Sequence, residues 1–134
     1  MKNRKVVRAV ISLSIVALLG FVIALGNIHA ATASPLVGDW NGTLSAGATS
    51  LRLVVHFSQD KDGKLSGTMD SLDQAGANGI VITTATFTDP NVHFEILSIT
   101  GVFDGKISKD NSEIAGDWKQ AGQSLPLMLK RAAK

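Results

Sequence analysis

The sequence predicts an all-β fold: an up-and-down antiparallel β-barrel of about eight strands that follows an N-terminal signal peptide. Three observations lead to this prediction. Apolar residues after residue 33 alternate with polar ones in short runs, which is the period of a strand with one buried face. Turn residues separate these runs at hairpin spacing. No stretch of the same region has a convincing helical period. A strongly curved sandwich is the alternative, because closure is not visible in a sequence.

The N-terminal segment differs from the rest of the chain. Four basic and no acidic residues precede an apolar run over 9–25, and small residues end in Ala31-Thr32-Ala33. We interpret residues 1–33 as a secretory signal peptide and residues 34–134 as a single β-barrel domain. An uncleaved anchor is the alternative, because the run is close to the shortest membrane span. The expected location is secreted or periplasmic, or membrane-anchored if the segment is retained.

The clearest element is a hairpin over 51–74. Leu51, Leu53, Val55 and Phe57 alternate with polar or smaller residues, and the pattern resumes at Leu65 after Asp60-Lys61-Asp62-Gly63. A three-residue loop over 61–63, with Gly63 in the left-handed conformation, predicts the register. Phe57 then faces Gly67, Val55 faces Met69, and His56 faces Thr68. A slip of one residue would move the apolar side chains to the wrong face.

The other expected strands follow from the same alternation and from their bounding turns. They cover residues 36–44, 80–87, 92–96, 103–107, 114–118 and 125–129. Gly38-Asp39-Trp40 and Gly116-Asp117-Trp118 form a short internal echo, which similar packing at the barrel seam would explain. Pro126 cannot donate a ladder hydrogen bond, so it should lie at an edge or at a weakly paired position.

Composition excludes several classes of function. The formal charge is +2, but after residue 30 nine basic side chains face eleven acidic ones. This region therefore lacks the net positive charge that a nucleic-acid-binding domain is expected to carry. The chain has no cysteine, which rules out disulfides and thiolate chemistry. There is no tyrosine, and there are two tryptophans, which weakens an aromatic-lined ligand site.

Candidate catalytic motifs are incomplete. Ser124 in Gly122-Gln123-Ser124-Leu125-Pro126 lacks the second glycine of a nucleophile elbow and precedes a strand. The loop over 60–63 resembles part of a calcium loop, but Ser58 and Met69 occupy positions where an EF-hand needs acids. We interpret this loop as a hairpin turn, and we expect no cofactor.

Two histidines, His56 and His93, follow residue 33 and should point away from the core. A zinc site would need both of them plus an acid such as Asp70 or Glu95, and the spacing does not require them to meet. Asp70 belongs to a small acidic loop that also contains Asp73, and such residues most often cap turns.

Five large inward-facing side chains are the candidate positions for ligand contact or plain core packing. They are Trp40, Phe57, Met69, Phe103 and Trp118. The sequence leaves these two interpretations open.

Several motifs together resemble the small β-domain that precedes the catalytic domain in many secreted bacterial α/β-hydrolases of the serine esterase and peptidase kind. They are GDWNGTL, LRLVVHFSQDKDGKLSGTMDSLDQ, G-x-F-x-G over 101–105, and IAGDWKQAGQSLPLMLKR. The similarity covers residues 36–131. The resemblance implies a non-catalytic accessory domain, since the family's catalytic residues lie downstream in a hydrolase domain that this chain is expected to lack. Leu72 departs from the family, which tends to have proline there.

A weaker likeness is to the calycins, the lipocalins and avidins, through Gly38-Asp39-Trp40 and the G-x-L-x-G-T over 63–68. It implies a shared barrel architecture. We therefore expect a secreted, non-catalytic binding or interaction module. The alternative is a stand-alone carrier of a small apolar ligand. The expected partners are a secreted α/β-hydrolase or such a ligand, and contact with the membrane is expected through the N-terminal segment alone.

Overall fold

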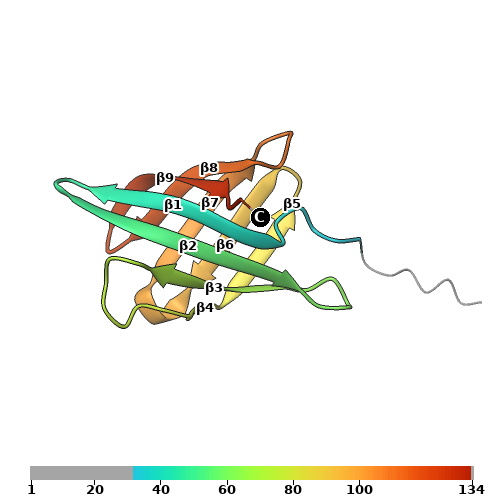
Figure 1. Cartoon of the computed structure of the whole chain (residues 1–134), viewed down its shortest axis with the longest axis horizontal. Coiled ribbons are helices and arrows are strands. Elements are labelled where there is room, and N and C mark those ends of the chain that lie inside the picture. Colours follow the sequence, from blue (N-terminus) through green and yellow to red (C-terminus); the bar gives the residue numbers. More distant parts are fainter. Residues whose placement is uncertain (1–31, 134) are drawn as a thin grey trace, which may run out of the picture.

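A computed structural model describes residues 32–133 and places their strands in one antiparallel sheet that curls into a nearly closed barrel (Figure 1). The order of strands in the sheet is β4-β3-β2-β1-β9-β8-β7-β6-β5. The elements are β1 Gly38–Ala46, β2 Thr49–Gln59, β3 Leu65–Ser71, β4 Ile80–Ile82, β5 Thr84–Thr88, β6 Asn91–Ile96, the 3-10 turn η1 Leu97–Ile99, β7 Gly101–Ile107, β8 Glu113–Gln120 and β9 Gln123–Arg131. This architecture confirms the predicted all-β antiparallel barrel.

The predicted signal peptide over residues 1–33 lies almost entirely outside the described residues. Among residues 32–133, no helix is long and apolar enough to span a membrane.

The strand expected over 80–87 is divided in two, and the division closes the barrel. β4 pairs with β3, whereas β5 pairs with β6. Thr83 stands between them, and its N–H donates to the carbonyl of Glu95 at 2.7 Å. Its hydroxyl accepts from the Leu97 N–H at 3.1 Å. The segment therefore changes its pairing partner at Thr83, and this change connects the two ends of the sheet. Because one expected strand becomes two, the sheet has nine strands instead of the predicted eight.

The β2–β3 hairpin has the predicted register. Val55 lies opposite Met69, His56 opposite Thr68, and Phe57 opposite Gly67. The loop over 61–63 has Gly63 at φ +87°. The carboxylate of Asp60 accepts hydrogen bonds from the N–H groups of Asp62 and Lys64, so this loop is a capped hairpin turn.

The barrel interior is filled by aromatic side chains around Phe94, which has no exposed surface. The ring of Phe94 stacks on Phe103 at 5.0 Å between centroids and meets the edge of Phe57 at 5.6 Å. Trp118 lies 6.2 Å away on a third side. These contacts pack the aromatic rings closely against one another in the core of the barrel.

The two tryptophans of the internal echo lie at opposite ends of the barrel. Trp40 is opposite Arg131 near the end of β9, whereas Trp118 is opposite Leu125 near its start. Both Trp-bearing strands flank β9, so the echo does not mark the seam between the first and last strands as expected.

Glycines on β1 and β7 leave space for large side chains of neighbouring strands. A Cβ at Gly42 would meet Leu129 rather than Trp40. Trp118 instead covers Gly101 of the neighbouring strand β7, where a Cβ would lie 2.2 Å from the ring. The glycines therefore make room for neighbouring side chains of several kinds.

The seam between β1 and β9 is short. The two strands pair from Trp40 opposite Arg131 to Gly42 opposite Leu129, and β1 then continues to Ala46 with β2 alone. In the continued register Ser45 would face Pro126, which has no N–H to donate. Pro126 is thus at a weakly paired position, as predicted.

In Figure 1 the β1–β2 hairpin extends beyond the other strands.

Candidate functional site

The mouth of the barrel, at the end where β3 leads into the 72–79 loop, contains a small cavity of about 210 Å³. The loop is anchored beside it, because the N–H of Ser71 donates to Ala77 O at 2.7 Å and that of Leu72 to Arg52 O at 2.9 Å. The cavity is lined by Leu44, Leu51, Leu53, Met69, Ser71, Gln74, Ala77, Ile80, Ile99, Trp118 and Gln120. Its walls are mainly apolar and contain no charged side chain.

One polar atom in this wall lacks a partner. Ser71 is 2% exposed, and its hydroxyl oxygen makes no hydrogen bond within the described residues. An unsatisfied buried polar group costs about 1–3 kcal/mol. Two other polar side chains of the mouth, Trp118 and Gln120, are hydrogen-bonded. The indole N–H of Trp118 donates to Gln120 Oε1 at 3.1 Å, and the amide of Gln120 donates to Ile99 O at 2.8 Å.

The five candidate positions are all buried, but they separate into two groups. Met69 and Trp118 line the mouth cavity. Trp40, Phe57 and Phe103 are not part of its lining. Ser71 is not among the positions predicted from the sequence, since an isolated serine at the end of a strand carries no recognisable signal.

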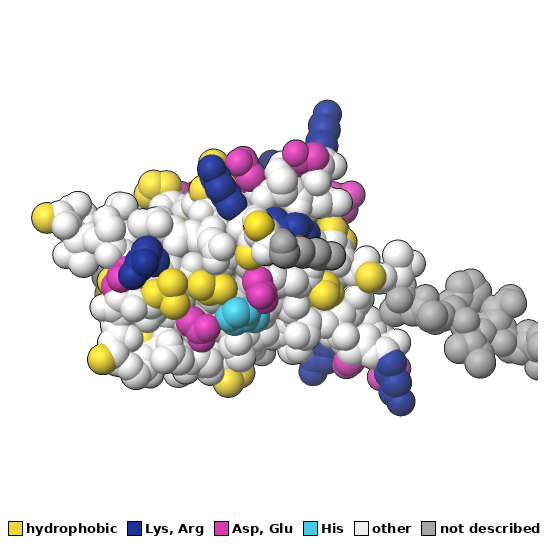
Figure 2. All heavy atoms as spheres, viewed as in Figure 1, with side chains coloured by type: hydrophobic (Ala, Val, Ile, Leu, Met, Phe, Trp, Pro, Cys, Tyr) yellow, Lys and Arg dark blue, Asp and Glu magenta, His cyan; other side chains and the backbone are white. Residues whose placement is uncertain are grey.

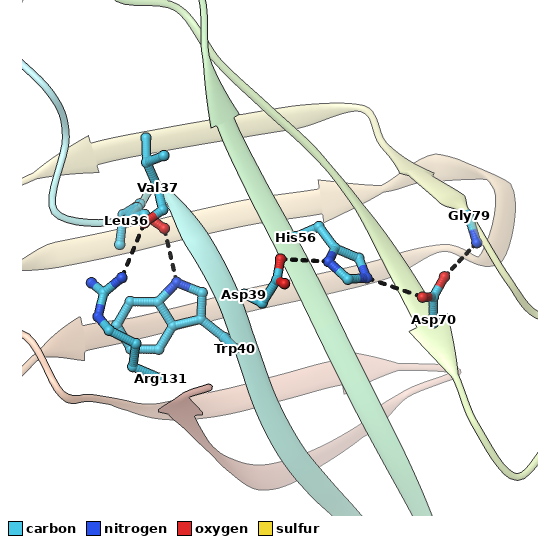
Figure 3. Close-up of polar contacts among 8 residues, drawn as sticks. All are labelled: Leu36, Val37, Asp39, Trp40, His56, Asp70, Gly79 and Arg131. Atoms are coloured by element: carbon cyan, nitrogen blue, oxygen red, sulfur yellow. Dashed lines mark hydrogen bonds and ion pairs between the residues drawn. The ribbon is translucent and has the colours of Figure 1, made fainter. Parts of the chain in front are cut away.

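The opposite end of the barrel is closed by Trp40 and Arg131 (Figure 3). The guanidinium of Arg131 stacks 4.3 Å above the Trp40 ring and donates to the carbonyls of Val37 and Pro35. The indole N–H of Trp40 donates to Leu36 O at 2.8 Å. Leu36 is fully buried, so the segment before β1 closes this end of the barrel. The hydrogen bonds from Trp40 and Arg131 hold the segment in place.

A histidine bridges two carboxylates on the outer face of β1, β2 and β3 (Figures 2 and 3). Nδ1 of His56 lies 2.6 Å from Asp39 Oδ1, and Nε2 lies 3.0 Å from Asp70 Oδ2. The other oxygen of Asp70 accepts from the Gly79 N–H at 2.6 Å, which ties the histidine to the end of the 72–79 loop. Carboxylates only accept hydrogen bonds, so the arrangement favours the doubly protonated imidazolium.

A second cluster of the same kind lies on β6 and β7. Nδ1 of His93 lies 2.6 Å from Asp104 Oδ1, and Nε2 lies 3.2 Å from Glu95 Oε1. Lys119 adds a looser contact to Asp104 at 3.6 Å. Both histidines point away from the core, as the alternation predicts, and they sit in separate clusters.

The geometry of these clusters argues for a structural role. Each ring nitrogen of His56 and His93 faces a carboxylate, so neither imidazole offers a free nitrogen to deprotonate a nucleophile. Ser124 lies in β9 directly after a tight turn, opposite Lys119, and not on a strand-to-helix turn. In the described part of the chain, no three His, Asp or Glu side chains are placed to bind a metal ion.

The carboxylates shift the pKa values of both histidines. The hydrogen bonds from Asp39 and then Asp70 raise the pKa of His56, and that from Asp104 is the main cause of the raised pKa of His93. In return, the Gly79 N–H and then His56 lower the pKa of Asp70, and His93 lowers that of Asp104.

The clusters predict a specific dependence of stability on pH. A raised histidine pKa stabilises the fold fully below its unfolded value of about 6.5, and this contribution is lost as pH rises through the folded value. The lowered carboxylate pKa values contribute above about pH 3.9 and are lost on acidification. Stability should therefore peak between about pH 4 and 6.5 and decline above it.

Urea unfolding at pH 5.5, 7 and 8.5 tests this dependence with the variant H56Q/H93Q. Both histidines are about one-third exposed, so each should contribute less than about 1 kcal/mol. The variant should lose most of the decline between pH 5.5 and 8.5. An equal decline in the variant and the original chain would contradict the role assigned to the two clusters.

An outer groove runs beside the seam. It has a volume of about 710 Å³ and is open to solvent along the face that β9, β1 and β2 share. Its lining includes the exposed apolar side chains of Leu72 and Met128 and the basic side chains of Arg52, Lys130 and Arg131. We refer to it as the seam groove.

The fold and these sites define an antiparallel up-and-down β-barrel with a packed interior, a small apolar mouth and a short ladder between β1 and β9. Comparisons of the chain with protein-family models, curated proteins and solved structures gave no match.

Proposed function

We propose that this chain is an exported, non-catalytic β-barrel module that binds a protein partner by accepting an extended segment at the open edge of β1. The observation that carries the proposal is the early end of the β1–β9 ladder. Beyond Gly42, the β1–β9 ladder has no further residue pairs, whereas Ala46 still lies opposite Thr49 of β2. Unpaired strand edges are templates for the addition of another strand.

Backbone direction supports this proposal. The carbonyl of Asp39 accepts from the N–H of Ala132, so Asp39 directs its backbone groups towards β9. Alternate residues of an antiparallel strand point to the same side, and Ser45 therefore directs its N–H and C=O to the open side. Across the seam, Pro126 offers no donor. An incoming strand would supply the donor that Pro126 cannot offer to the Ser45 carbonyl.

The seam groove supplies further contacts beside this edge. Leu72 and Met128 are 51% and 47% exposed, and a partner strand could cover them. The basic side chains that flank the groove already have acidic partners: Arg52 pairs with Asp73 at 2.7 Å, and Lys130 lies 4.0 Å from Glu113. The resemblance to hydrolase-associated β-domains makes a secreted α/β-hydrolase the first partner to test.

Photo-crosslinking in the producing cell tests this proposal. A benzophenone amino acid at Thr43, which is exposed beside the open edge, should yield a discrete protein adduct. The same probe at the exposed Lys106 on β7, on another part of the wall, should not.

Two substitutions at Ser45 provide the matched control. S45P removes the N–H that faces the open side and should abolish the Thr43 adduct, whereas S45A keeps that N–H and should preserve it. Adduct formation that S45P leaves intact would contradict strand addition. Ester hydrolysis by the purified domain, tested with p-nitrophenyl acetate, would contradict a non-catalytic module.

A further inference from the structure

The mouth cavity has the features of a small-molecule site that is separate from the open edge of β1. It is lined by side chains from β1, β2, β3, β4 and β8, most of them apolar, and residues of the 72–79 loop and η1 contribute to its rim. Sites for small ligands are typically concave and apolar, with a few polar groups that fix orientation.

Ser71 provides such a polar group. Its side chain is almost completely buried, belongs to the cavity wall and has a hydroxyl without a partner. Nearby, Trp118 and Gln120 are already hydrogen-bonded to one another and to Ile99. Ser71 is therefore positioned to supply the polar contact for a bound molecule.

The size and charge of the cavity define the class of ligand. A volume of about 210 Å³ equals roughly seven water molecules at liquid density, which corresponds to about six to ten non-hydrogen atoms. The lining contains no charged side chain, so an ionised ligand would lose its hydration without compensation. We propose that the barrel mouth binds a small neutral molecule with an apolar body and one hydroxyl or carbonyl group, which hydrogen-bonds to Ser71.

The two tryptophans allow a direct test by NMR on the predicted domain, residues 34–134. They give two indole N–H signals: Trp118 lies in the cavity wall, and Trp40 lies at the opposite end of the barrel. Titration with p-cresol should shift the Trp118 signal in a saturable manner and leave the Trp40 signal in place. Benzoate, its charged counterpart, should shift neither signal.

The variant S71A tests the hydrogen bond, with toluene as the matched apolar probe. S71A should weaken p-cresol binding about fivefold or more and leave toluene binding within twofold. The melting temperature without ligand should not fall, because the substitution removes a hydroxyl that has no partner. Equal shifts of both indoles, no Trp118 shift with either probe, or unchanged p-cresol affinity in S71A would each overturn the proposal.

Discussion

Replacing Phe94 by alanine is expected to lower the free energy of unfolding by about 3–5 kcal/mol, the range for deletion of a buried aromatic ring. The reason is the position of its ring, which contacts Phe57, Phe103 and Trp118 and has no exposed surface. The surrounding strands are linked by ladder hydrogen bonds and cannot collapse fully into the space left behind.

Urea or thermal unfolding measures this effect. For a domain of about one hundred residues, a change of 1 kcal/mol corresponds to about 4–8 °C in Tm, so F94A should melt at least roughly 12 °C lower. F87A is the matched control, because Phe87 is only partly buried at the edge of the core. A loss in F94A no larger than that in F87A would show that the barrel is not organised around Phe94.

Replacing Gly101 by alanine should destabilise the barrel by about 1–3 kcal/mol, the usual cost of overpacking a core. The added Cβ would lie 2.2 and 2.3 Å from two carbons of the Trp118 ring, which is too close for any real contact. Trp118 is 2% exposed and cannot swing out without opening the mouth of the barrel.

A double-mutant cycle with W118F isolates this contact. Phenylalanine lacks the outer ring carbons that meet the new Cβ, so G101A should cost less in the W118F background. We expect a coupling of at least about 0.5 kcal/mol from equilibrium unfolding of the four proteins. Strict additivity would mean that the two residues do not touch as described.

The β2–β3 hairpin was predictable from sequence because a single glycine fixes its loop. Gly63 in a three-residue loop determines the register, and the alternation of Val55 and Phe57 then determines which face is buried. The partner change at Thr83 was not predictable in this way. It depends on where two distant strands meet, and the residues on both sides of Thr83 are uniformly β-prone.

The candidate sites were only partly predictable. Met69 and Trp118 were correctly expected to face inward, but their place in a cavity depends on the loop and the 3-10 turn that cover the mouth. The contact between Arg131 and Trp40 joins residues at opposite ends of the domain sequence. The seam had one local signal, Pro126, whose missing N–H indicated a weakly paired position before the neighbouring strand was known.

Hydrogen exchange at the Ser45 amide tests most directly whether β1 has an open edge, on which the proposed function rests. In the isolated domain, this amide should exchange at least about tenfold faster than that of Leu44, which faces β2 and lies opposite Leu51. Added partner should slow the exchange at Ser45 and leave Leu44 unchanged. If the Ser45 amide is as protected as that of Leu44 in the isolated domain, the seam is closed in solution and strand addition at β1 is contradicted.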